Sequence, residues 1–134
     1  MVRVVTNARP LAGAWWPVRI EGVLASLRVS STRGVHVKFI QFIEFETDDI
    51  DAFQGEVDRW VEESADWRTA THFTLCADRD RPGSYVHIVE FPSYEDAMKN
   101  SNDPRTAEFA QRMATLVGGA RSFRNFDMLR EGGF

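Results

Sequence analysis

Residues 37–46, with the sequence VKFIQFIEFE, decide the fold prediction for this chain. In a β-strand, successive side chains point to opposite faces of the sheet, and here both faces are apolar. One face carries Val37, Phe39, Ile43 and Phe45, and the other carries Ile40 and Phe42. A strand that is apolar on both faces is buried on both, so we expect residues 36–46 to need a cover on each side.

The sequence that follows predicts a helix and a hairpin. Apolar residues recur at three- and four-residue spacing over residues 48–65, with Thr47 or Asp48 as the cap, which indicates an amphipathic helix. Two strands are expected at residues 68–77 and 85–91. The polar turn between them, residues 78–83, contains Pro and Gly, so the two strands should pair as a hairpin.

Two more helices and a strand complete the predicted order. Ser93 with Asp96 is a capping signal for a short helix, and Asp103-Pro104 is the start of a longer one. The longer helix should be lined by Ala107, Ala110, Met113, Ala114 and Val117, and it should stop at Gly118-Gly119. A last strand is expected over residues 120–130. This order predicts an α+β, ferredoxin-like β-α-β-β-α-β fold, with an antiparallel four-stranded sheet and both long helices on one face.

The sheet face that turns away from the helices is too apolar for water. If the strand registers hold, it carries Ile40, Phe42, Val86, Ile88, Phe126 and Met128. A second copy of the same sheet would bury this patch twice through one isologous contact. The sequence therefore predicts a homodimer in which two sheets close into a dimeric α/β barrel.

The first 36 residues differ from the rest of the chain. They contain five arginines and one acidic residue and show no periodic apolar pattern. We expect residues 1–36 to be a disordered tail or a misassigned upstream start, with Val37 as the native start, and residues 37–134 to form one domain. The alternative is a real arm whose Trp15-Trp16 pair docks on the body or on a partner.

Composition argues against several function classes. The chain has 134 residues, a formal net charge of -4 and a pI near 5.4, which argues against a nucleic-acid partner. No stretch approaches the run of about 18 apolar residues that a membrane span needs. The single cysteine, Cys76, cannot form an internal disulfide, and the histidines show no metal-binding spacing. We expect a cytoplasmic protein that uses no metal or cofactor.

Four segments carry a family resemblance: residues 38–45 (KFIQFIEF), 78–86 (DRDRPGSYV), 91–98 (FPSYEDAM) and 123–127 (FRNFD). They resemble a group of small, mostly uncharacterised actinobacterial proteins. That group is similar to the dimeric α/β-barrel superfamily, which contains the antibiotic biosynthesis monooxygenase domain. The resemblance covers residues 37–131. It implies a pocket between the sheet and the helices, used in some members for cofactor-independent oxidation of aromatic or quinol substrates and in others for haem degradation.

The short helix departs from a pattern of that superfamily. Several monooxygenase-like members carry Ala-Phe-x-x-His there, whereas residues 97–101 of this chain read AMKNS. Ser101 therefore stands where the histidine would be. A mechanism or a haem ligand that depends on that histidine does not carry over to this chain.

Three polar side chains interrupt apolar strand faces: Gln41, His87 and Asn125. If these faces all point toward the helices, the three converge on one apolar cavity, which is the usual composition of a small-molecule site. A neutral His87 would act there as a base or a donor, and the amides would hold a carbonyl or phenol oxygen. The alternative is that a neighbouring group satisfies each of them, as happens for most buried polar groups.

Aromatic residues complete the predicted site. Tyr85 and Phe91 share the strand face of His87, and Trp67 lies at the entry to the second strand, where it could rim the pocket. We expect these three to contact a ligand. His72 and Cys76 are interpreted as ordinary strand residues, since neither has a chemical partner nearby in the sequence.

Two classes of function follow. The first is a cofactor-independent oxygenase or isomerase that acts on a small, planar, largely apolar compound, with His87 as the base and Gln41 or Asn125 holding the oxygen. The second is a non-catalytic dimeric carrier or sensor, and haem binding or degradation is a weaker third. Membership of the fold does not choose between them, because one fold hosts many functions.

Overall fold

The computed structural model describes residues 37–117 and 122–134. Within these ranges the elements are β1 (Phe39–Glu46), α1 (Ile50–Glu63), β2 (His72–Ala77), β3 (Ser84–Phe91), α2 (Tyr94–Asn102), α3 (Pro104–Leu116) and β4 (Ser122–Asp127). The expectations for residues 1–36, including the Trp15-Trp16 pair, and for the stop at Gly118-Gly119 fall outside the described residues.

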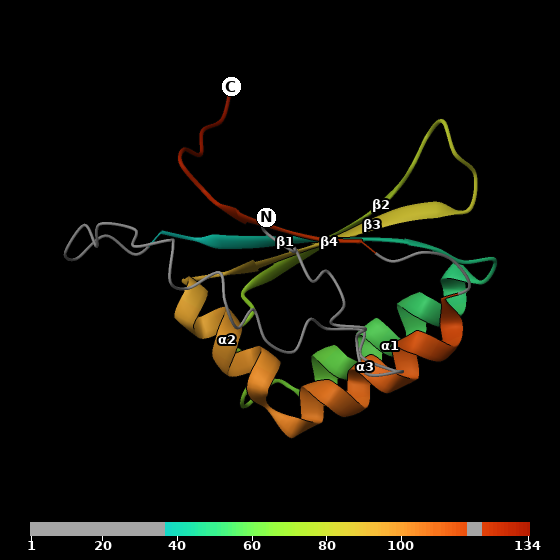
Figure 1. Cartoon of the computed structure of the whole chain (residues 1–134), viewed down its shortest axis with the longest axis horizontal. Coiled ribbons are helices and arrows are strands. Elements are labelled where there is room, and N and C mark those ends of the chain that lie inside the picture. Colours follow the sequence, from blue (N-terminus) through green and yellow to red (C-terminus); the bar gives the residue numbers. More distant parts are fainter. Residues whose placement is uncertain (1–36, 118–121) are drawn as a thin grey trace, which may run out of the picture.

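The four strands form one antiparallel sheet in the order β2-β3-β1-β4. Figure 1 shows α1, α2 and α3 together on one face of this sheet. The predicted α+β, ferredoxin-like fold is therefore confirmed. In this topology β1 and β3 are the central strands, so their side chains lie under the middle of the helical layer.

The hydrophobic core lies between the helices and the inner face of the sheet. Alternate residues of β1 are buried there, and the ring of Phe45 stacks on Phe53 of α1 with 4.3 Å between centroids. The buried apolar side chains are Phe39, Ile43, Phe45, Phe53, Val57, Val89, Phe91, Ala97, Phe109, Ala110 and Met113. Full burial of one large apolar side chain contributes about 1.5–3 kcal/mol, so this layer supplies the main driving force for folding.

The cap of α1 lies one residue later than predicted. Asp49, rather than Thr47 or Asp48, accepts a hydrogen bond from the backbone N–H of Ala52 at 3.0 Å. The hydroxyl of Thr47 instead donates to the carbonyl of Leu116 at 2.7 Å. Thr47 thus ties the end of β1 to the end of α3, and its oxygen accepts the backbone N–H of Asp49, at 3.2 Å, rather than an N–H of the first turn of α1.

The two later helices begin at their predicted caps. Ser93 accepts the N–H of Asp96 at 3.1 Å, and the Asp103 carboxylate accepts the N–H of Arg105 at 2.9 Å. The buried face of α3 agrees with the prediction at Ala110 and Met113, and it also includes Thr106 and Phe109, which were not predicted. The predicted Ala107 is exposed, because turning Phe109 inward buries more apolar area than turning alanines inward. In the described part of the chain, no helix is long and apolar enough to cross a membrane.

The second strand begins four residues later than predicted, at His72. Arg68 and Thr69 leave the sheet because their backbone N–H groups bond elsewhere, whereas the N–H of Thr71 already donates to the carbonyl of Glu90 in β3 at 2.9 Å. The N–H of Arg68 donates to the carbonyl of Ser64, and the N–H of Thr69 donates to the side-chain oxygen of Asn100 at 3.3 Å. This segment therefore passes from α1 to β2 beside the end of α2.

The outer face of the sheet carries the predicted apolar side chains. The register places Ile40 opposite Phe126 and Phe42 opposite Ile88, and the rings of Phe42 and Phe126 lie 5.0 Å apart. Phe126 is 37% exposed. None of the described helices covers this face (Figure 1).

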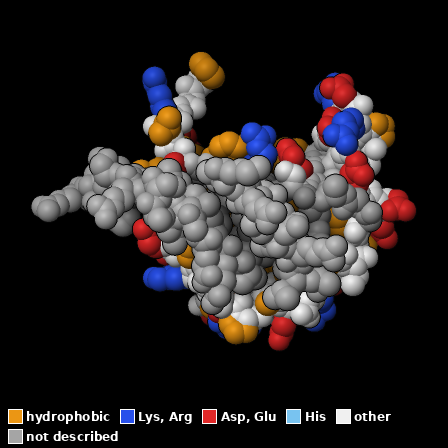
Figure 2. All heavy atoms as spheres, in the orientation of Figure 1, with side chains coloured by type: hydrophobic (Ala, Val, Ile, Leu, Met, Phe, Trp, Pro, Cys, Tyr) orange, Lys and Arg blue, Asp and Glu red, His pale blue; other side chains and the backbone are white. Residues whose placement is uncertain are grey.

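The turn between β2 and β3 projects beyond the sheet. Figure 2 shows charged side chains of both signs on this projection. The Asp78 carboxylate accepts the backbone N–H groups of Asp80 and Arg81, and Gly83 has a φ of 86°, in the left-handed region that glycine tolerates. The sequence predicts this polar turn, and its local hydrogen bonds explain why it does not join the core.

Candidate functional site

A cavity of about 230 Å³ lies between the inner face of β2 and β3 and the helices α1, α2 and α3. Its apolar walls are Val57, Val61, Phe73, Val89 and Phe109. Phe73 is 41% exposed on the edge strand β2, so the cavity lies close to solvent on that side. A cavity with apolar walls and a few polar groups is the usual form of a small-molecule site.

His87 of β3 lines this cavity and is 6% exposed. The rings of Phe53 and Phe73 meet it edge-on, with centroid distances of 5.8 Å and 5.6 Å. Neither ring nitrogen has a hydrogen-bond partner among the described residues. Burial lowers the pKa of His87 from 6.5 to about 4, because an apolar site disfavours the charged form. The imidazole is therefore neutral near pH 7, with one nitrogen able to donate and the other able to accept.

Three helical side chains join His87 around the cavity. Trp60 comes from α1, Asn100 from the last turn of α2 and Thr106 from the first turn of α3. The indole nitrogen of Trp60, the Nδ2 of Asn100 and the hydroxyl of Thr106 are buried without a partner among the described residues.

The buried polar atoms without a partner belong mainly to residues that line this cavity. Six buried side-chain atoms lack a partner in the part of the chain that the structure describes, and five of them belong to Trp60, His87, Asn100 and Thr106. The sixth is the Oε1 of Gln41. Buried polar groups in native proteins are nearly all hydrogen-bonded, since leaving one unpaired costs about 1–3 kcal/mol. Five of these atoms belong to residues that line one cavity, which makes this cavity the candidate functional site.

Arg68 is the charged residue that lines the cavity. Its Nη1 donates to the carbonyl of Val61 at 2.6 Å and to the hydroxyl of Ser64 at 3.3 Å. Its guanidinium lies 6.0 Å from the ring of Trp60. Arg68 therefore braces the end of α1 and places a positive charge beside the indole.

The predicted amides lie elsewhere. The Nε2 of Gln41 donates to the Oδ1 of Asn125 at 3.0 Å, across the β1–β4 pair, and neither residue lines the cavity of His87. Gln41 is 2% exposed, whereas Asn125 is exposed on the edge strand β4. The structure thus brings Gln41 and Asn125 to each other and not to His87.

The predicted aromatic residues also lie outside the cavity wall. Tyr85 stacks on Phe45 at 5.7 Å, and Phe91 is fully buried in the core. The indole of Trp67 donates to the carbonyl of Glu63, and its ring meets Trp60 edge-on at 6.3 Å. The ring of Trp67 therefore packs against the ring of Trp60. Among the predicted site residues, only His87 lines the cavity.

Sequence reasoning missed Trp60, Asn100 and Thr106 as site residues. One signal was present: Thr106 stands three, four and seven residues before Phe109, Ala110 and Met113, which is the spacing of one helix face. A polar residue on that face is oriented toward the sheet. The placement of Asn100 has no such signal, because it depends on the path of residues 68–71.

Ser101 takes no part in the cavity wall. It is buried, and its hydroxyl donates to the carbonyl of Ala97 at 2.9 Å within α2. The serine that replaces the histidine of the superfamily pattern is thus bonded to its own helix.

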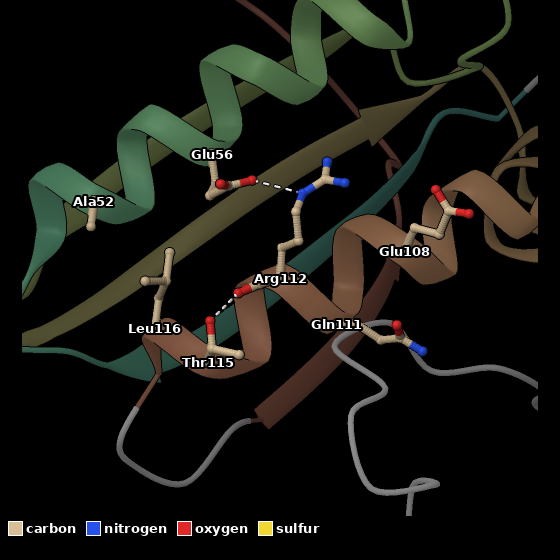
Figure 3. Close-up of a pocket in the computed structure, with 7 residues that line it drawn as sticks. All are labelled: Ala52, Glu56, Glu108, Gln111, Arg112, Thr115 and Leu116. Carbon is tan, nitrogen blue, oxygen red and sulfur yellow. Dashed lines mark hydrogen bonds and ion pairs between the residues drawn. The ribbon is translucent and has the colours of Figure 1, made fainter.

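A second, open groove of about 520 Å³ runs between α1 and α3 (Figure 3). Arg112 donates to Glu56 at 2.8 Å and to Glu63 at 3.1 Å across this groove. The hydroxyl of Thr115 donates to the carbonyl of Arg112. These groups satisfy each other, so the groove lacks the unpaired polar atoms of the His87 cavity.

The fold and the cavity define a class: a ferredoxin-like α+β protein with a cavity between the sheet and the helices. No protein-family model and no curated protein matches this chain. Solved structures do share its fold. SnoaB, a cofactor-independent oxygenase from Streptomyces nogalater, is 18% identical, with a TM-score of 0.60 over 72% of this chain and 96% of that chain.

Two other solved structures are similar. A Nitrosomonas europaea protein proposed to be an antibiotic biosynthesis monooxygenase is 15% identical, with a TM-score of 0.59 over 72% of this chain and 94% of that one. Rv0793 from Mycobacterium tuberculosis is 13% identical, with a TM-score of 0.57 over 72% and 99%. At these identities the likeness establishes the fold, which is that of antibiotic biosynthesis monooxygenase-like proteins.

Proposed function

We propose that this protein is a cofactor-independent enzyme that oxidises or isomerises a small, planar, largely apolar compound in the His87 cavity. The observation that carries the proposal is the group of five unpartnered polar atoms around one apolar cavity. The oxygenase activity printed for SnoaB, which shares the fold, agrees with it. Both reaction types begin with the same step, the removal of a proton from the substrate.

His87 is the proton acceptor in this proposal. Its unprotonated ring nitrogen takes a proton from a carbon next to a carbonyl or phenol group, and the electron pair of the broken C–H bond stays in the ligand as a delocalised anion. Burial keeps the pKa of His87 low in the empty cavity. An anion beside the ring favours the imidazolium, so the proton affinity of His87 rises as the reaction proceeds.

Two fates of the anion then complete the reaction. In an isomerisation, the imidazolium returns the proton to a different carbon. In an oxidation, the anion transfers its electrons to O2, a C–O bond forms, and the resulting peroxide anion takes the proton from the His87 imidazolium to give a hydroperoxide. Loss of water then converts the original CH2 group into a carbonyl, with one oxygen atom in the product and the other in water.

A carrier or sensor function is the second candidate, and the low basicity of His87 favours it. Native mass spectrometry of the protein from its own host would first give the mass of the bound compound. That compound is then incubated with the protein in air and analysed by chromatography and mass spectrometry. Gain of one oxygen with loss of two hydrogens, or an isomer of equal mass, supports the enzyme. Return of the unchanged compound contradicts it and leaves the carrier.

We also propose that the protein is a homodimer, with the outer sheet face as the interface. The apolar outer face formed by Ile40, Phe42, Ile88 and Phe126 supports this, because a patch of that kind is rarely left in water. Light scattering after size exclusion should give twice the chain mass. Phe42→Glu should give the monomer, whereas Gln111→Glu, on the exposed side of α3, should remain dimeric. A monomeric wild-type protein would contradict the interface.

A further inference from the structure

The exposure of the residues that line the His87 cavity locates its mouth. Three consecutive lining residues are exposed: Thr71, His72 and Phe73. The other lining residues, on α1, α2, α3, β3 and the segment before β2, are buried or half-buried. Residues 71–73 lie at the start of β2, which is an edge strand of the described sheet. The cavity therefore opens to solvent at the start of β2.

Phe73 is the apolar side chain of these three. It lies opposite buried Val89 on the inner face of the sheet, and its ring meets the ring of His87 edge-on, with 5.6 Å between centroids. A second ring, that of Phe53 in α1, meets His87 at 5.8 Å. Phe53 is fully buried, whereas Phe73 is 41% exposed. One aromatic wall of His87 thus belongs to the core, and the other separates the imidazole from solvent.

The proton affinity of His87 depends on burial and not on a neighbouring charge. Its cross-strand neighbours are Ile43 and Leu75. The other titratable or charged side chains that line the cavity are Arg68 and His72, and no carboxylate lines it in the described part of the chain. Burial holds the pKa of His87 at about 4. Water that reached the imidazole would stabilise its charged form and raise the pKa toward 6.5.

We propose that Phe73 is a positioning residue that closes the mouth of the cavity, with its ring shielding His87 from water and the ligand entering past it. Its part in catalysis rests on the proposed function, because it acts through the same His87. Closing a site expels water and prevents side reactions of reactive intermediates. In the proposed reaction, the ring of Phe73 keeps water from protonating the ligand anion before it reacts further.

The first test is an NMR titration of the histidine rings in the full-length protein, with His87→Gln and His72→Ala to assign the signals. The wild type should give a pKa of about 4 for His87. Phe73→Ala removes the ring and should raise this pKa by about one unit or more, which is a tenfold gain in proton affinity. Phe73→Val is a milder change that keeps a side chain suited to a strand, and it should raise the pKa in the same direction.

The second test measures access to the ring with diethyl pyrocarbonate, which acylates accessible neutral imidazoles. Peptide mass spectrometry follows each histidine separately. In the wild type, His87 should react more slowly than exposed His72, and in Phe73→Ala the two rates should become similar. Phe73→Tyr keeps the ring and should behave as wild type.

Phe123→Ala is the matched control for both tests. Phe123 lies on the inner face of β4, the opposite edge strand, in the same cross-strand row as His87. It does not line the cavity, so its removal should leave both the pKa and the reaction rate of His87 unchanged.

Three results would overturn the proposal. They are a wild-type His87 that reacts as fast as His72, an unchanged pKa or rate in the Phe73→Ala and Phe73→Val variants, and an equal response in Phe123→Ala. Failure of the proposed function gives a different result. In an active enzyme, the acid limb of the pH profile of kcat/KM should move upward with the pKa of His87 in Phe73→Ala. If the bound compound is returned unchanged in air while the pKa and the rate still respond, Phe73 closes the cavity of a carrier and only its part in catalysis is wrong.

Discussion

Gln41 and His87 both interrupt the apolar inner face of the sheet, yet the structure treats them in opposite ways. Gln41 lies on β1 opposite Asn125 of β4, and the two amides share a hydrogen bond of 3.0 Å. His87 lies on β3 between Ile43 and Leu75, neither of which can accept or donate through its side chain. The amide in β1 is bonded within the sheet, while the imidazole in β3 is left facing a cavity.

The comparison shows that the cross-strand partner decides what a buried polar residue does. A polar residue that has a polar cross-strand neighbour forms a hydrogen bond with it, and the bond then helps to hold the sheet together. A polar residue between two apolar neighbours needs a partner from the helical layer or from a ligand. Above His87, the helices supply further unpaired donors from Trp60 and Asn100 rather than partners that already satisfy the ring.

The largest expected difference between the two residues is in turnover. His87→Gln should lower kcat for the compound recovered with the protein by about 10²–10⁴-fold, the usual contribution of a general base. Gln41→Leu should leave kcat within a few-fold of wild type, because Gln41 does not line the cavity. Steady-state assays of oxygen uptake or product formation check both. Equal losses of kcat in the two variants would contradict the different roles given to His87 and Gln41.

The pH dependence of stability gives the next largest effect. The pKa of His87 is about 4 in the folded protein and near 6.5 when unfolded, so the unfolded state binds more protons between these values. The stability that neutral His87 contributes is therefore fully present above pH 6.5 and is lost as the pH falls toward 4. Complete loss of this contribution lowers the free energy of unfolding by roughly 3 kcal/mol. Urea unfolding at several pH values measures it. His87→Gln should remove this part of the pH dependence, and His72→Ala, at an exposed residue at the start of β2, should retain it.

A smaller effect is expected from the amide pair. Asn125→Ala leaves the Nε2 of buried Gln41 without its acceptor and should cost about 1–3 kcal/mol in the free energy of unfolding. Adding Gln41→Leu to this variant should restore part of the loss, because the unpaired amide is then gone. Equilibrium unfolding of both single variants and the double variant gives the coupling. Additive losses would show that the bond is not structural.

The smallest change in the free energy of unfolding is expected from a variant that should weaken ligand binding without destabilising the fold. Thr106→Val keeps the shape of the side chain and removes a buried hydroxyl that has no partner among the described residues. The free energy of unfolding should stay equal or rise by up to about 1 kcal/mol, whereas ligand affinity should fall. Thermal unfolding and a binding titration measure the two quantities. A clear destabilisation would mean that the hydroxyl is satisfied within the protein.

Most of the fold could be predicted from the sequence because its signals are local. Alternation over residues 37–46 and the caps at Ser93 and Asp103 each depend on a few neighbouring residues. The errors came where a tertiary contact overrode the local pattern. Arg68 and Thr69 look like part of a strand, but their backbone N–H groups bond to Ser64 and Asn100 instead.

The candidate site was less predictable because five elements build it: α1, β2, β3, α2 and α3. His87 was predicted as a site residue because it interrupts an apolar strand face. Gln41 and Asn125 interrupt apolar faces in the same way, so the sequence predicted all three as site residues. Their mutual hydrogen bond depends on the β1–β4 register, which no single strand reveals. Trp60 fits an ordinary core stripe in α1, and only the unpaired indole N–H distinguishes it.

We infer that the polar groups around His87 bind a ligand, whereas the Nε2 of Gln41 is bonded to Asn125 within the sheet. An NMR titration of the ¹⁵N-labelled protein with 4-nitrophenol distinguishes the two regions. We expect the side-chain amide of Asn100 and the indole N–H of Trp60 to shift on binding, while the side-chain amide of Gln41 does not. Shifts at Gln41 with none at Asn100 or Trp60 would contradict it.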